Sequence, residues 1–115
     1  MHFNTGAIKF QTKESVDLVT QTINIGVPGS SGWHSHPGVV LVTVKTGSVV
    51  RYDEHCAATV YTADTPNSAF VESGDHAGLV RNESGTPAVV YVTFVVPAGT
   101  TALRIDKANP GCPQN

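Results

Sequence analysis

The stretch that decides the fold is Gly32-Trp33-His34-Ser35-His36-Pro37, which is followed by the apolar run Val39–Val44 and by Gly47. Side chains alternate between the two faces of a strand, so His34 and His36 should point to the same side. Two imidazoles on one side can bind one ion together. Apolar residues at both odd and even positions of Val39–Val44 predict a strand buried on both faces. We therefore expect the imidazoles to face a cavity inside a β-structure.

This stretch resembles the first motif of the cupins, in which a His-x-His pair is followed by a glutamate and then by a glycine. Here His34 and His36 form the pair, and Gly47 lies eleven positions after His36. The motif glutamate would be residue 40 or 41, where this sequence has Val40 and Leu41. The resemblance implies a jelly-roll barrel and a metal site of three histidines that lacks the usual carboxylate.

A second cupin motif, Pro-x-Gly-x-x-His-x-x-x-Asn, resembles residues 73–82. Alignment on Asn82 puts the motif histidine at Gly78, and the nearest histidine is His76. Residues 76 and 78 share a face if the segment is a strand, so we expect His76 to be the third metal ligand. An exposed turn histidine is the alternative.

Other residues near the two motifs are candidates for the rest of the site. They are Glu72 and Asp75 as a replacement carboxylate, Val40 and Phe94 as an apolar wall, and Trp33 as a wall for a flat substrate. The alternatives are a solvated surface position for each carboxylate and packing at the barrel mouth for Trp33.

The rest of the chain predicts an all-β fold. About eight or nine short apolar segments alternate with turns rich in Gly, Pro, Asn and Ser, and no segment has a helical period. A jelly roll pairs so many short strands while hiding their edges. We expect one domain over residues 1–115, with a barrel core at about 15–97 and a tail at 98–115.

The predicted all-histidine site suits a divalent transition metal such as iron, manganese, nickel, copper or zinc. Among cupins, such sites occur in some iron dioxygenases, so the resemblance implies oxidation of a small organic substrate by dioxygen. Two alternatives stay open. One is a non-catalytic cupin that binds a small molecule or a metal, and the other is an isomerase, lyase or cyclase that uses the metal without dioxygen. The sequence identifies no catalytic base.

Composition and cysteine content limit the partners and the compartment. The formal net charge of −2 gives no electrostatic reason to bind nucleic acid or an anionic membrane. No apolar run approaches the ~20 residues of a membrane span, and no secretory leader is visible, so we expect a cytoplasmic protein. Cys56 and Cys112 form either a disulfide, which would favour an extracytoplasmic location, or two free thiols. Small cupins often dimerise, so a homodimer through an edge strand is also expected.

Overall fold

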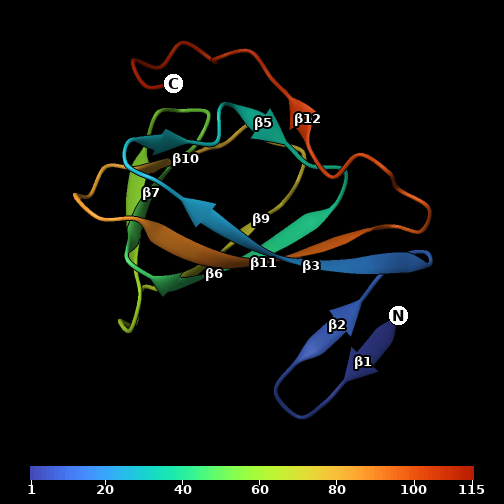
Figure 1. The fold of residues 1–115 in the computed structure, drawn as a ribbon. Coiled ribbons are helices and arrows are strands. Elements are labelled where there is room, and N and C mark those ends of the chain that lie inside the picture. Colours follow the sequence, from blue (N-terminus) through green and yellow to red (C-terminus); the bar gives the residue numbers. More distant parts are fainter.

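The computed structural model describes residues 1–115 and contains twelve strands and no helix (Figure 1). The strands are β1 (His2–Asn4), β2 (Lys9–Gln11), β3 (Val16–Ile25), β4 (Gly29–Ser30), β5 (His34–Ser35), β6 (Val39–Thr46), β7 (Ser48–Tyr52), β8 (Ala58–Thr62), β9 (Ala69–Glu72), β10 (Leu79–Asn82), β11 (Ala88–Pro97) and β12 (Ile105–Asp106). The prediction of an all-β fold is confirmed. The structure has no helix long and apolar enough to cross a membrane.

Two four-stranded sheets form the barrel. One has the order β4-β10-β7-β8 and the other the order β3-β11-β6-β9, and all their strand pairs are antiparallel. The small β12-β5 sheet lies at one end of the barrel (Figure 1). The β1-β2 hairpin precedes β3 and projects away from the barrel, on the side opposite the β12-β5 sheet. β3 and β9 are the edges of the second sheet. The predicted homodimer stays a prediction.

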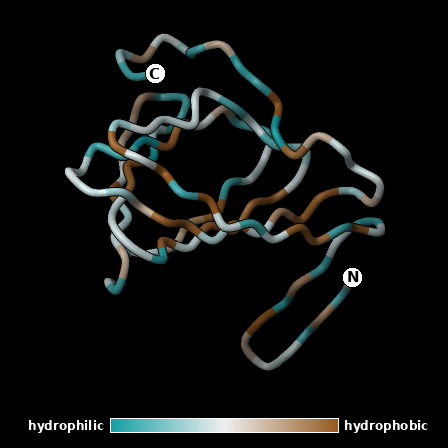
Figure 2. Tube along the Cα trace, in the orientation of Figure 1, coloured by the Kyte–Doolittle hydropathy of each residue, from teal (hydrophilic) through white to brown (hydrophobic).

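In the second sheet, buried and exposed side chains alternate along β6 and β9, as expected for strands with one face on the core. In β6, Val40, Val42 and Val44 are buried, whereas Val39 and Leu41 are 39% and 43% exposed. The expectation that this strand is buried on both faces was wrong, because no layer covers its outer face. Figure 2 shows hydrophobic residues along β6 and β11, and others on the projecting hairpin.

The interior contains two hydrophobic clusters. The larger one lies inside the barrel and includes the valines of β6 and β11 together with Phe70 and Phe94. The smaller one consists of Trp33, Tyr52, Leu79 and Cys112. It lies where the C-terminal segment 98–115 packs on the barrel, and a disulfide between Cys56 and Cys112 anchors that segment. Of the two states considered from the sequence, a disulfide or two free thiols, the structure has the disulfide.

Two glycines, one at each end of β6, allow close backbone approaches. Gly47, the closing glycine of the first motif, has φ +81°, and a Cβ there would lie 2.9 Å from the Pro87 carbonyl oxygen. A Cβ at Gly38 would lie 2.0 Å from the carbonyl oxygen of Val95. The chain after the histidine pair therefore crosses β11 at a distance that only glycine permits.

Candidate metal centre

His34 and His36 both point into the barrel, as their spacing predicts. They are 6% and 8% exposed, and their ring centroids lie 4.7 Å apart. β5 carries His34 and pairs with β12 of the C-terminal segment, while His34 also forms an isolated bridge with Gly78. Neighbours on two sides therefore fix the backbone that presents the imidazoles.

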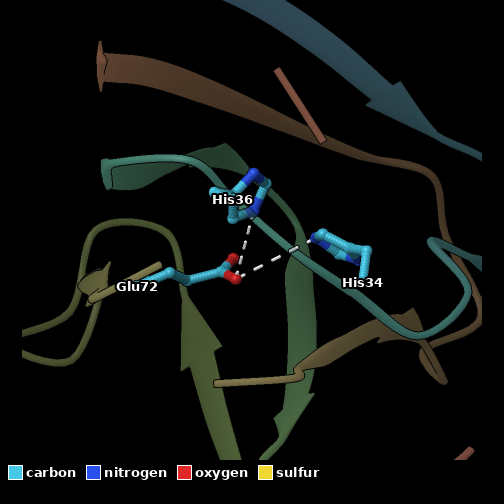
Figure 3. Close-up of side chains that lie close together, drawn as sticks. All are labelled: His34, His36 and Glu72. Atoms are coloured by element: carbon cyan, nitrogen blue, oxygen red, sulfur yellow. Dashed lines mark ion pairs between the residues drawn. The ribbon is translucent and has the colours of Figure 1, made fainter. Parts of the chain in front are cut away.

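Glu72 supplies a carboxylate to the same place from the end of β9. It is 6% exposed, and its Oε2 lies 3.4 Å from His36 Nε2 and 3.9 Å from His34 Nε2 (Figure 3). One ligand atom from each of the three residues lies within 4.8 Å of the others. The expected all-histidine site is thus replaced in the structure by two imidazoles and one carboxylate.

The register of β6 and β9 explains how Glu72 reaches this position. Glu72 pairs directly with Val40, which is one of the two positions where the cupin motif has its glutamate. Directly paired residues project on the same face of a sheet, with Cβ atoms about 4.5–5.5 Å apart. Glu72 on the neighbouring strand therefore lies on the same side of the barrel as a glutamate at position 40 would.

Backbone carbonyls orient both imidazoles. His34 Nδ1 lies 2.8 Å from the Gly32 carbonyl oxygen, and His36 Nδ1 lies 2.8 Å from that of Leu103. A carbonyl only accepts hydrogen bonds, so each Nδ1 carries a hydrogen and, in the neutral ring, each Nε2 has its lone pair free. Such an arrangement is typical of histidines that bind metals through Nε2.

The three groups shift one another's protonation. Burial lowers the pKa of His34, and this effect exceeds the opposing influence of its bond to Gly32. Burial also acts to lower the pKa of His36, but the nearby Glu72 carboxylate and the Leu103 carbonyl raise it above 6.5 overall. Burial acts to raise the pKa of Glu72, but His36, His34 and Arg51 together lower it. Glu72 is therefore an ionised ligand candidate near neutral pH.

An apolar cavity of ≈ 410 Å³ adjoins the three groups. Val40 and Phe94 line it, as expected for the predicted wall. Trp33 does not line it. Its indole packs in the smaller cluster and donates a hydrogen bond to the Gln114 carbonyl at 3.0 Å, which matches the packing alternative.

The structure does not bring His76 or Asp75 to the cavity. The side chains of His76 and Asp75 are 62% and 83% exposed, and His76 Nδ1 lies 2.9 Å from Glu54 Oε1. The shared-face argument for positions 76 and 78 fails because β10 begins only at Leu79 and residues 74–76 form a bend. Glu72, not His76, is the third member of the group.

The donor set fits a divalent transition metal. An ion with bonds of about 2.1 Å separates neighbouring donors by roughly 3.0–3.4 Å in octahedral or tetrahedral geometry. The two nitrogen–oxygen separations in the structure, 3.4 and 3.9 Å, need only small side-chain movements to match. Nitrogen and carboxylate ligands suit iron, manganese, nickel, copper and zinc, so the identity of the ion stays open.

No family model matches the sequence, and no curated protein matches it. Among solved structures, the chain is similar to an uncharacterized conserved protein with a double-stranded beta-helix domain from Klebsiella pneumoniae. The TM-score is 0.63 at 18% identity, over 81% of this chain and 79% of that one. It is also similar to the DMSP lyase DddQ from Ruegeria pomeroyi, with a TM-score of 0.66 at 15% identity over 84% and 46% of the two chains.

A third similar structure is an oxalate oxidase in complex with the substrate analogue glycolate. Its TM-score is 0.58 at 17% identity, over 66% of this chain and 40% of that one. The chain thus spans less than half the length of the lyase and of the oxidase. At such low identities these similarities concern the fold alone.

Proposed function

We propose that this chain, which has the double-stranded β-helix fold of the cupins, is a metal-binding protein in which His34, His36 and Glu72 hold one divalent transition-metal ion. The observation that carries this proposal is the convergence of two oriented Nε2 atoms and one carboxylate oxygen inside the barrel. Cupin-fold neighbours that include an oxalate oxidase and a DMSP lyase support it.

We further propose an oxygenase-type reaction on a small organic substrate. Two histidines and one carboxylate that leave other coordination positions open are a ligand set typical of non-haem iron(II) oxygenases. A bound iron(II) would supply dioxygen activation and Lewis acidity there. Of the protein's own groups, Glu72 offsets part of the ion's charge, and the two carbonyls hold the imidazoles in place. The valines and Phe94 exclude water from the cavity.

Metal content tests the ligand assignment. Protein purified without a chelator or a nickel column should contain about one ion per chain by elemental analysis. His34→Ala and Glu72→Gln should both lose it while the β circular dichroism persists, because each change removes a donor. His76→Ala is the matched control, since its exposed imidazole lies outside the group, and it should keep the metal. Unchanged metal content in His34→Ala would refute the assignment.

Nitric oxide, a surrogate for dioxygen, tests the reaction class. The iron(II) form should give a high-spin iron–nitrosyl signal in electron paramagnetic resonance, because open positions accept a diatomic ligand. An iron(II) form without this signal would favour one of the two other functions. Turnover of a carbonyl compound without dioxygen would then indicate a lyase or isomerase, and a metal-loaded protein without turnover would indicate a binding module.

The disulfide bears on the compartment. Disulfides persist in oxidising environments and are rare in the cytosol. The Cys56–Cys112 bond therefore supports an extracytoplasmic location, which we propose in place of the cytoplasmic expectation. Thiol counting on freshly isolated, alkylated protein tests this, and two free thiols would refute it.

A further inference from the structure

The register of the β3-β11-β6-β9 sheet shows which side chains share the wall of the cavity. Directly paired residues project on the same face of a sheet, so each row of pairs crosses the wall from one strand to the next. Two such rows start on β9, and they consist of Glu72, Val40 and Phe94, and of Phe70, Val42, Val92 and Gln21. All of these residues line the cavity. The cavity therefore extends from the candidate metal centre across β6 and β11 to β3.

The cavity is closed at the metal centre and open at β3. Glu72 is 6% exposed, whereas Ile23, on the inner face of β3, is 37% exposed and Gln21 on the same face is exposed as well. Across the opening, Ser30 of β4 and Arg104 are exposed and also line the cavity. β3 and β4 are edge strands of their two sheets and do not pair with each other. The opening therefore lies at the seam between these two strands.

The wall between the two ends is hydrocarbon. The side chains of Val40, Val42, Val92 and Phe94 carry no hydrogen-bonding group, and they are all buried. β9 and β3 are three strand spacings apart in the sheet, about 14 Å. The cation at the mouth, Arg104, is occupied by Asp106 and by the Ser31 carbonyl, both at 2.9 Å. A ligand that reaches the metal centre through the seam therefore passes over apolar surface for most of its length.

We propose that the substrate is an elongated molecule with one polar, metal-binding end and an uncharged hydrocarbon body, and that it enters through the seam between β3 and β4. This inference rests on the proposed function, because the polar end would bind the ion held by His34, His36 and Glu72. The body would lie across β6 and β11 and remove their apolar side chains from water. A charged group on the body would lose its hydration without gaining a partner in the wall. Small polar molecules, which leave the wall uncovered, should therefore bind weakly.

A series of straight-chain hydroxamates tests the hydrocarbon body, because the two oxygens of a hydroxamate bind zinc and the length of the chain can be varied alone. Isothermal titration of the zinc-loaded protein should show an affinity that rises about two- to fourfold for each methylene added between acetohydroxamate and hexanohydroxamate.

Val42→Thr should weaken hexanohydroxamate binding about three- to tenfold and change acetohydroxamate binding by less than about twofold, because it puts a hydroxyl into the apolar wall. Val44→Thr is the matched control. Val44 lies on the same strand and face and is 3% exposed, but it does not line the cavity. This variant should leave both affinities unchanged.

Gln21→Phe tests the entrance. A ring on the inner face of β3 narrows the seam, so association of hexanohydroxamate should slow by about tenfold or more, as measured by stopped-flow absorbance of the cobalt-loaded protein. Thr22→Phe is the matched control, because Thr22 pairs with Tyr91, which is exposed on the outer face of the sheet. Its association rate should equal that of the wild type.

Zinc titration of each protein separates this inference from the proposed function. If zinc binds but hydroxamate affinity does not depend on chain length, or falls equally in Val42→Thr and Val44→Thr, the hydrocarbon body is refuted. Equal association rates in Gln21→Phe and Thr22→Phe refute the entrance. Failure to bind zinc overturns the proposed function. Binding of hexanohydroxamate to the chelator-treated protein that Val42→Thr weakens would then still support the apolar cavity as the ligand site, and its absence would overturn both.

Discussion

Replacing both cysteines of the Cys56–Cys112 disulfide with serine should lower the free energy of unfolding by about 4 kcal/mol. The bond joins residues 56 positions apart, and the loop-closure entropy that it removes from the unfolded chain sets this magnitude. A domain of this size has a total stability of about 5–15 kcal/mol, so the variant should still fold. Its melting temperature should fall by about 15 °C.

The same change should weaken the metal centre at a distance. The disulfide anchors the C-terminal segment 98–115, in which the Leu103 carbonyl accepts the Nδ1–H of His36 at 2.8 Å. β12 of this segment also pairs with β5, which carries His34. A loosened segment holds the imidazoles less firmly. Loss of such an orienting contact typically lowers metal affinity about tenfold or more.

Urea denaturation of the metal-free protein measures the first effect, and zinc titration against a competing chelator measures the second. Wild-type protein treated with a reductant is the parallel perturbation and should behave as the double-serine variant does. A loss of less than about 1 kcal/mol would refute the loop-entropy argument. Unchanged zinc affinity would refute the orienting role of the C-terminal segment.

Three further predictions concern single residues. In the metal-free protein, burial acts to lower the pKa of His36 but Glu72 raises it above 6.5. The stabilisation from this pair should therefore be complete below pH 6.5 and lost as the pH rises through the raised pKa, and NMR titration of Glu72→Gln should show a lower His36 midpoint. Gly38→Ala places a Cβ 2.0 Å from a backbone oxygen and should cost about 3 kcal/mol or more in urea denaturation, whereas Gly85→Ala meets nothing within 4 Å and should change stability by less than about 0.5 kcal/mol. Asn82→Ala removes a 3%-exposed amide with four hydrogen bonds and should cost about 2–3 kcal/mol by the same assay.

Strand alternation predicted the part of the site that lies on regular backbone. His34 and His36 are two residues apart in an extended segment, and their side chains do enter the barrel together. Glu72 follows the same rule, because Phe70 is buried with it while Val71 is 59% exposed. The sequence offered Glu72 only as one of two carboxylates, since nothing in it gives the register between β9 and β6.

Alternation failed where the backbone is irregular or where burial depends on a second layer. His76 lies in a bend, so its spacing from position 78 carries no information about its direction. Val39 and Leu41 are as apolar as the buried valines of β6, but no element covers their side of the sheet. The C-terminal segment that carries Cys112 has almost no regular structure. Its path across the barrel, and with it the pairing of Cys112 with Cys56, cannot be predicted from local sequence pattern.

The direct pairing of Glu72 with Val40 has a consequence for how candidate metal centres of this kind are recognised. Two neighbouring strands offer equivalent anchor points for a donor, so a ligand can change its place in the sequence by some thirty residues while its charge stays where it was. A motif that demands an acid at a fixed interval after the histidines overlooks such a rearranged centre. A template written as paired positions across the sheet would find it, and the exchange Val40→Glu with Glu72→Val would convert one arrangement into the other.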